Sequence, residues 1–319
     1  GLFNVGAGAD FKNSKMQIAY AFQGGLGLPT AEYYSKADYA ALRTAYQAHI
    51  AKVLELAGSS PAQAKQEAGQ VLAFETRLAG VSLMPVDLRK PENQYHFVTL
   101  ADADKASSHL SWTRFFMAQK ADVKDGFSLS QPKFFAEVDK MIGDVPVAQW
   151  RAYLRFHAID SASPYLSKPF ADEYFAFYNK TLNGQKEQEP RWKRVLSAMN
   201  ETMGMALGEL YVAKAFPPES KARALELVNN VKDSLKSRIE HLDWMSDATK
   251  QKALEKWATF LPKIGYPDKW RDWTGVKITP DNYYGNLLAA TQFDYDYDIA
   301  KIGKPTDRLE WGMTPQTVN

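Results

Sequence analysis

The sequence predicts a mainly helical protein with strand-like pieces at both of its ends. Apolar residues recur at spacings of three and four through most of residues 30–290, which is the period of an amphipathic helix. Glycine, proline and serine separate these runs at positions typical of helix boundaries, and strand-like runs occur only near the two ends. We therefore expect a strand-like connection at 1–29, a helical domain at 30–290 and a return segment at 291–319.

The first part is not helical in its pattern. Residues 2–8 and 16–23 are strand-like runs, and the polar stretch 10–14 between them predicts a turn. Gly24, Gly25 and Gly27 then break the second run before Pro29.

Helices follow, each with its own boundary signals. The first carries an apolar face that ends at Gly58, and Ser60 and Pro61 predict the N-cap and first turn of the next helix, which runs to about Leu78. Ser246 predicts another N-cap, for a helix that continues through Leu261. The face of the first helix consists of Leu42, Tyr46, Ile50, Val53, Leu54 and Ala57, and further helices are expected at 147–159, from Pro190, after 217–220 and at 282–291. The last residues given, 315–319, resemble part of a strand.

Length and composition limit the classes of function. The chain has 319 residues, 45% of them hydrophobic and 24% charged, which suits a globular protein of about two domains. The net charge of +2 gives no general reason to expect nucleic acid or an anionic membrane as a partner. Absence of cysteine excludes disulfides and thiolate chemistry, and no run of 18 apolar residues predicts a membrane span.

No metal or catalytic motif is present in this chain. A helical zinc site needs two histidines at i and i+4, so that both rings face one ion. No two of the five histidines are spaced in this way, and we expect each to be a core or surface residue with its own partner. They are His49, His96, His109, His157 and His241.

Three other stretches resemble functional motifs only in part. Residues 294–298 (DYDYD) begin like a calcium loop, but the turn glycine and the final glutamate are replaced by Ile299 and Pro305, so we expect an exposed loop or edge. Residues 24–27 (GGLG) lack the Lys-Ser/Thr of a phosphate loop and predict a tight turn. Residues 191–194 (RWKR) could contact nucleic acid, but a solvated helix start explains them better.

Several stretches, taken together and in order, resemble the neprilysin-like zinc metallopeptidases of family M13. The resemblance covers nearly the whole chain and rests on the shared order and spacing of its parts. The matching stretches are 23–29 (QGGLGLP), 32–34 (EYY), 150–157 (WRAYLRFH), 164–170 (PYLSKPF), 190–194 (PRWKR), 206–212 (ALGELYV), 242–245 (LDWM), 249–250 (TK), 264–270 (IGYPDKW) and 311–319 (WGMTPQTVN).

The resemblance implies that this chain is a fragment of such a peptidase, mostly its helical lid domain. In the family, a His-Glu-x-x-His helix and a Glu-x-x-x-Asp helix follow the point that Asn319 matches, and they hold the zinc. The strand-like ends would then belong to the catalytic domain. Asn319 matches the asparagine that hydrogen-bonds the backbone of a bound peptide, whereas in the chain taken alone it would be a frayed terminal residue. No catalytic residue and no metal ligand is expected in this chain, and the fragment alone is expected to be inactive.

The function implied by the resemblance is that of a zinc-dependent endopeptidase acting on oligopeptides. Its partners would be those substrates and its own C-terminal catalytic domain. Its compartment would be the periplasm or the extracellular space, with the cytoplasm left open. The alternative is a non-catalytic helical scaffold derived from such a peptidase.

Overall fold

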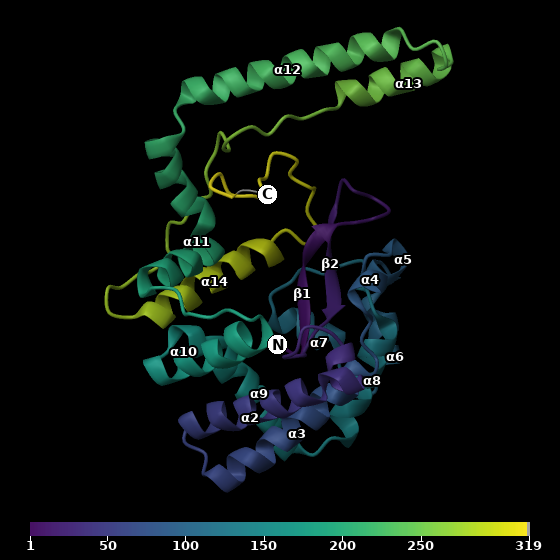
Figure 1. The fold of residues 1–319 in the computed structure, drawn as a ribbon. Coiled ribbons are helices and arrows are strands. Elements are labelled where there is room, and N and C mark those ends of the chain that lie inside the picture. Colours follow the sequence, from purple (N-terminus) through teal and green to yellow (C-terminus); the bar gives the residue numbers. More distant parts are fainter. Residues whose placement is uncertain (318–319) are drawn as a thin grey trace. The chain divides into compact units, whose positions relative to one another are not determined.

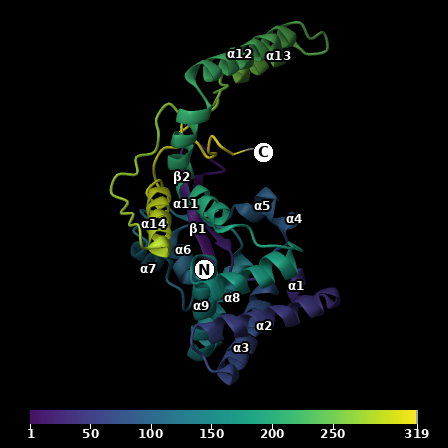
Figure 2. The same ribbon diagram turned by 60° about the vertical axis from the view of Figure 1, so that its left-hand side comes forward.

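The structure is a computed structural model that describes residues 1–317, and its chain divides into two compact units (Figures 1 and 2). Unit 1 comprises Gly1–Pro190 and Lys277–Thr306, and unit 2 comprises Arg191–Val276 and Asp307–Asn319. Helices dominate both units, which confirms the mainly helical class predicted from the sequence.

A four-stranded sheet with the order β1-β2-β4-β3 lies in unit 1. The predicted N-terminal strands are confirmed as β1 (Phe3–Ala9) and β2 (Gln17–Gln23), which pair in antiparallel fashion. Two strands that the sequence pattern did not reveal, β3 (Phe97–Val98) and β4 (Phe127–Leu129), complete the sheet, with β4 parallel to β2. Strands of two and three residues are too short to show a period of two.

Most helices of unit 1 pack against one another, and α14 (Tyr283–Ile299) packs against β1. The helices of unit 1 are α1 (Glu32–Ser35), α2 (Ala40–Leu56), α3 (Pro61–Ala79), α4 (Pro85–Leu88), α5 (Pro91–Gln94), α6 (Leu100–Ala106), α7 (Trp112–Ala118), α8 (Pro132–Asp144), α9 (Val147–Ala162), α10 (Lys168–Tyr174) and α14. Three short turns of other helix types are η1 (Ala37–Tyr39), η2 (Ser163–Tyr165) and the π-helical η3 (Phe175–Leu182).

Local chemistry sets the boundary between α2 and α3 as predicted. Gly58 follows α2 with φ +94°, a conformation that costs glycine little. Ser60 caps α3, its hydroxyl accepting a hydrogen bond from the backbone N–H of Gln63 at 3.4 Å. The two helices therefore turn back on each other and bury facing apolar stripes.

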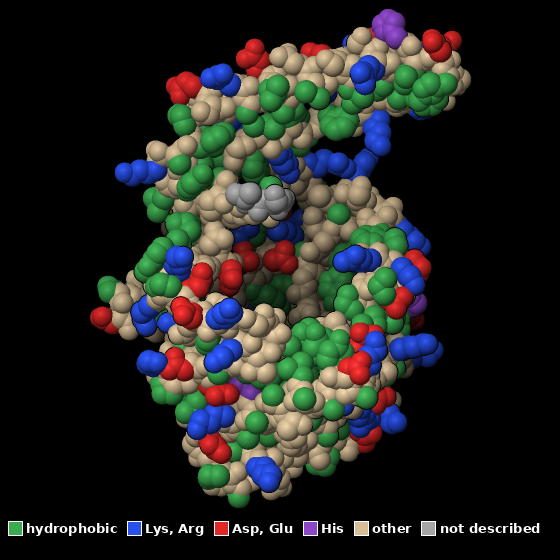
Figure 3. All heavy atoms as spheres, viewed as in Figure 1, with side chains coloured by type: hydrophobic (Ala, Val, Ile, Leu, Met, Phe, Trp, Pro, Cys, Tyr) green, Lys and Arg blue, Asp and Glu red, His purple; other side chains and the backbone are tan. Residues whose placement is uncertain are grey.

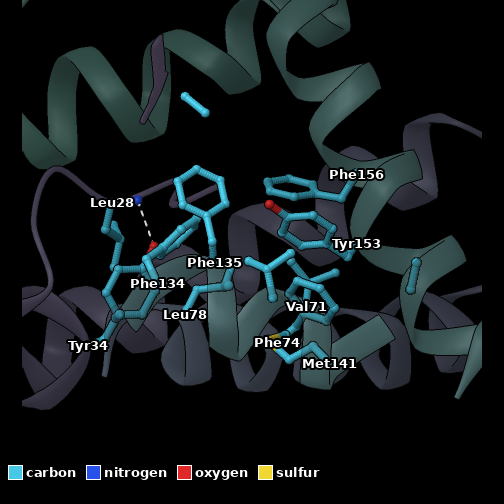
Figure 4. Close-up of a cluster of buried hydrophobic side chains, with 14 of the residues drawn as sticks. Leu28, Tyr34, Val71, Phe74, Leu78, Phe134, Phe135, Met141, Tyr153 and Phe156 are labelled. Atoms are coloured by element: carbon cyan, nitrogen blue, oxygen red, sulfur yellow. Dashed lines mark hydrogen bonds between the residues drawn. The ribbon is translucent and has the colours of Figure 1, made fainter. Parts of the chain in front are cut away.

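The core of the helical part of unit 1 lies between α2, α3 and α9, and Figure 4 shows the part of it near α3, α8 and α9. Val71 and Leu78 of α3 are fully buried, and Phe74 stacks on Tyr153 of α9 with ring centroids 4.1 Å apart. A second group of rings, centred on the fully buried Trp112 and Phe127, joins the sheet to α7 and α8. The two groups belong to one continuous hydrophobic cluster.

Unit 2 consists of α11 (Arg191–Ala215), α12 (Pro218–Glu240), α13 (Asp247–Ala258) and the segments around them. Helices α12 and α13 lie side by side as a hairpin (Figures 1 and 2), and the indole N–H of Trp257 donates to the carbonyl of Lys232 at 2.7 Å. Ser246 caps α13 as predicted, but the helix ends at Ala258, three residues before Leu261.

Two expectations from the sequence were wrong in the described residues. Residues 294–298 are not a loop or edge but the last turns of α14, whose N-cap is Asn282; the tyrosine Tyr295 packs against the core and donates to Gln119. Residues 314–317 form a turn, not a strand, because the N–H of Thr317 donates to the carbonyl of Thr314 at 3.1 Å. Within residues 1–317, no helix is long and apolar enough to cross a membrane.

Candidate functional site

The segment that leads to Asn319 is the candidate site in unit 2. Asn319 itself lies outside the described residues, so the predicted contact with a peptide is not visible. Residues 314–317 are described, and their turn is closed by the hydroxyls of Thr314 and Thr317, 2.6 Å apart. The local conformation just upstream of the predicted peptide-binding residue is therefore defined.

Helix α11 holds this segment through one side chain. The amide nitrogen Nε2 of Gln316 donates to Oδ1 of Asn200 at 2.6 Å and to the carbonyl oxygen of Gly204 at 2.9 Å. Both acceptors lie on α11, four residues apart, and so belong to one face of the helix. Gln316 is thus fixed by two hydrogen bonds three residues before Asn319.

Residues 264–270, another of the stretches that resemble the M13 peptidases, lie in the same unit. Two lysines hold this part of the chain in place. The ammonium of Lys221 on α12 donates to the carbonyl of Tyr266 at 2.8 Å and to the carboxylate of Asp268 at 2.7 Å. It also lies 4.2 Å from the centroid of the Tyr266 ring, a cation–π contact. Lys263 donates to the carbonyl of Glu310, which ties this stretch to the segment before Asn319.

The glycine-rich turn of residues 24–27 in unit 1 faces a buried carboxylate. Oε2 of Glu75 accepts hydrogen bonds from the backbone N–H of Gly27 at 3.1 Å and from the hydroxyl of Tyr34 at 2.5 Å. Tyr46 donates to both oxygens of the same group. A carboxylate in this place repels phosphate, so the turn cannot act as a phosphate loop.

The tyrosines around Glu75 remain protonated donors. Burial raises the pKa of Tyr34 well above the ordinary value for a phenol, and the charge and hydrogen bond of Glu75 raise it further. Burial likewise raises the pKa of Tyr46. Each hydroxyl can therefore donate to the carboxylate throughout the physiological pH range. Figure 4 shows the hydroxyl of Tyr34 also accepting from the backbone N–H of Leu28, at 2.9 Å.

A cavity of about 350 Å³ lies beside the same turn. Its walls include Asn4 and Gln23 from the sheet, Ser82 after α3, and the edge of His157 on α9. His157 is the one titratable side chain among its lining residues, and its Nε2 lies 2.9 Å from Oε1 of Glu75. The cavity therefore offers polar contacts from Asn4, Gln23, Ser82 and His157.

Four of the five histidine rings contact another group, and that of His109 lies 3.5 Å from the carboxylate of Asp139. His49 is buried between Asp160 and Glu173, and His157 contacts Glu75. The exposed His241 lies 2.7 Å from the carbonyl of Ser237 on its own helix. None of these contacts brings two histidines together.

A zinc ion finds no ligand set in the described part of the chain. Across residues 1–317, no three His, Cys, Asp or Glu side chains converge in a way that could hold a metal ion. Zinc in proteins takes at least three such side chains. The described residues therefore do not fit a catalytic zinc, and no step that depends on one can be assigned to them.

The amino-acid sequence matches a known family of peptidases. Residues 1–267 match the family described as peptidase family M13. The chain belongs to peptidase family M13. The resemblance inferred from the sequence is thereby confirmed, and with it the assignment to the neprilysin-like metallopeptidases.

Relatives with curated names cover the whole chain. The chain is 29% identical to Neprilysin-3 of Drosophila melanogaster, over 100% of this chain and 43% of that protein. It is 27% identical to human Endothelin-converting enzyme 1, over 99% of this chain and 43% of that protein.

Solved structures give the same picture. The zinc metalloprotease Zmp1 of Mycobacterium tuberculosis in its open state superposes with a TM-score of 0.94 at 34% identity, over 100% of this chain and 50% of that one. Zmp1 in complex with an inhibitor superposes with a TM-score of 0.89. The chain spans about half the length of the M13 peptidases that it matches.

Sequence reasoning did not find Asn200, Gln316 or Glu75. A signal for the first two was present, since Gly204 and Gly208 interrupt the helical pattern of α11 at a spacing of four. Each glycine in a helix interior costs about 1 kcal/mol relative to alanine, so two on one face indicate that something packs there. Glu75 carries no comparable signal, because its partners come from distant parts of the sequence.

Proposed function

We propose that this chain is part of a zinc-dependent endopeptidase that cleaves oligopeptides. It supplies the helical domain that encloses the substrate chamber and one edge of the cleft, and the remaining half of the protein supplies the zinc ligands. The observation that carries this proposal is the likeness to the zinc metalloprotease Zmp1 along the whole chain, at 34% identity over only half of Zmp1.

The exposed apolar face of α11 supports a partner in the same polypeptide. Trp192, Leu196 and Met199 follow one another at spacings of four and three, and they are 64%, 45% and 40% exposed. A stripe of this kind normally packs against another part of a protein. We propose that the other half of the peptidase covers it.

Helix α12 presents a similar stripe. None of its residues is buried, and Leu227, Val231 and Leu235 lie four residues apart with exposed fractions of 65%, 63% and 42%. Figure 3 shows hydrophobic side chains gathered along the α12–α13 hairpin. A two-helix hairpin buries only one side of each helix, so this surface also suits the rest of the polypeptide.

Asn319 is the proposed contact with substrate. Its amide can both donate to and accept from the backbone of an extended peptide, as in recognition by strand addition. This role comes from the family resemblance of residues 311–319 and is supported by the anchoring of Gln316 on α11.

The test compares three preparations on an internally quenched oligopeptide. The full-length protein should cleave it, a zinc chelator should abolish cleavage, and added zinc should restore it. The 319-residue chain alone and a full-length variant with both histidines of its His-Glu-x-x-His motif changed to alanine should be inactive. Chelator-sensitive cleavage by the 319-residue chain, or no cleavage by the zinc-loaded full-length protein, would overturn the proposal. The second outcome would favour a scaffold.

A further inference from the structure

Helix α11 carries a face of small residues against which the segment before Asn319 lies. Gly204 and Gly208 are both buried, and they share this face with Asn200 at spacings of four residues. A Cβ atom on Gly204 would lie 2.8 Å from Cγ2 of Thr314, and one on Gly208 would lie 2.7 Å from Cδ of Pro315. These distances are too short for any side chain, so the segment approaches α11 as closely as it does only because both positions are glycine.

The helix is distorted where the segment contacts it. Met203 has φ −129° and ψ 31°, which is not helical, and the next residue is Gly204, whose carbonyl oxygen accepts from Gln316. Sharp changes of helix direction occur at glycines and where a side chain inserts into the backbone hydrogen bonding. The shape of α11 at this point is therefore adapted to the segment.

The orientation of the Gln316 amide is fixed by its surroundings. Its Nε2 faces two oxygen acceptors, so a flipped amide would bring Oε1 against both of them. In the present orientation Oε1 is buried and has no hydrogen-bond partner within the described residues. The two hydrogen bonds donated by Nε2 therefore set the orientation of this amide.

We propose that Asn200, Gly204, Gly208 and Gln316 form a positioning device for the peptide-binding segment. The device fixes residues 314–316 on α11, upstream of Asn319, to which the proposed function assigns the contact with substrate. This inference rests on the proposed function, and its four residues are positioning residues that do not themselves touch substrate. A binding group that is misplaced by about 1 Å can cost up to about 100-fold in rate.

The experiment is a double-mutant cycle in the full-length peptidase. Gln316→Ala should raise KM and lower kcat/KM about tenfold or more in the wild-type background, and Asn200→Ala should do the same. In an Asn319→Ala background, Gln316→Ala should cause little further loss, because the residue that it positions is already missing. A loss of the same factor in both backgrounds would overturn the inference, since a general effect on folding acts equally in each.

Two further variants distinguish an effect on the position of residues 314–316 from an effect on the stability of the fold. Asn200→Asp keeps the oxygen acceptor and should retain most of the activity that Asn200→Ala loses. Thr202→Ala removes a hydrogen bond of similar burial within α11, from the Thr202 hydroxyl to the carbonyl of Ala198 at 2.8 Å, and should leave KM unchanged. Rates are expressed per active site titrated with a tight-binding inhibitor, so that unfolded protein does not count.

Failure of this inference is distinguishable from failure of the proposed function. If the wild-type full-length protein cleaves the peptide and the Gln316→Ala effect is independent of Asn319, the result contradicts only the positioning role. If the wild-type protein does not cleave any peptide, the result contradicts both the proposed function and the positioning role.

Discussion

The imidazole of His49 lies 3.0 Å from the carboxylate of Asp160, and this contact joins the middle of α2 to the end of α9. The other ring nitrogen of His49 lies 2.9 Å from Oε1 of Glu173. Only a charged imidazolium can donate from both nitrogens at once. Tyr178 donates to the second oxygen of Asp160, so the buried group forms a network in which each member has a partner.

The stability of the chain should fall as the pH rises through the pKa of His49. Burial lowers the pKa of His49, but the hydrogen bonds and charges of Asp160 and Glu173 raise it more, and the net direction is upward. The folded state therefore binds the proton more tightly than the unfolded state, in which the pKa is about 6.5. The stabilisation is complete below that pH and is lost as the pH passes the folded value.

Urea unfolding of the chain between pH 6 and 9 tests this prediction. The free energy of unfolding of the wild type should fall with pH more steeply than that of His49→Gln, by up to about 1.4 kcal/mol per pH unit. His241→Gln, which changes an exposed histidine, should behave like the wild type. Parallel curves for wild type and His49→Gln would show that His49 is not charged in the fold.

Asp139 should contribute stability at neutral pH that disappears in acid. Burial raises the pKa of Asp139, but the backbone N–H groups of Ser108, His109 and Leu110, at 2.7–2.8 Å, lower it more, and the net direction is downward. Stability from this group is present above the unfolded pKa of about 3.9 and is lost as the pH falls through the folded value.

The variant Asp139→Asn should lose about 1–3 kcal/mol at pH 7, and the difference from the wild type should shrink toward pH 3. Asp122→Asn is a suitable control, because the Asp122 side chain is 69% exposed. A constant difference between Asp139→Asn and the wild type across the pH range would contradict the assignment of the charge.

Sequence reasoning located the elements that local chemistry defines and missed those that depend on distant pairing. The turn at Gly58 and the cap at Ser60 were predicted, because each depends on residues within one helical turn. The strand β4 was not, because it exists through pairing with β2 about 108 residues earlier, as in the Ala19–Phe127 pair. The pairing of Gln316 with Asn200 was not predicted either, since it joins residues 116 positions apart, although Gly204 and Gly208 indicate that something packs on that face of α11.

Glu75 should be among the polar side chains whose replacement costs the most stability. It is completely buried, and donors from the glycine-rich turn, α1, α2 and α9 converge on its carboxylate. Glu75→Gln keeps the shape but replaces one acceptor oxygen with a donor, so at least one of these donors loses its partner. The expected loss is about 2–3 kcal/mol in the free energy of unfolding.

Hydrogen exchange gives a local measurement of the same change. The amide of Gly27 should exchange faster in Glu75→Gln, because its N–H donates to Glu75 in the wild type. Glu92→Gln, at an exposed position in α5, should alter neither stability nor exchange at Gly27. Unchanged protection of Gly27 in Glu75→Gln would mean that the turn is held by other contacts.

Two glycine substitutions should change stability in opposite directions. A Cβ atom on Gly27 would lie 1.8 Å from the hydroxyl of the fully buried Tyr46, so Gly27→Ala should destabilise the chain by more than about 2 kcal/mol. A Cβ atom on Gly69, in the interior of α3, would meet only Nε2 of Gln47 at 3.5 Å, an ordinary contact. Gly69→Ala should therefore stabilise the chain by about 0.5–1 kcal/mol, because alanine loses less backbone entropy in a helix.

Thermal unfolding of the two variants beside the wild type measures both shifts. A stabilised Gly27→Ala would show that the turn can move away from Tyr46, and a destabilised Gly69→Ala would place a closer neighbour against α3.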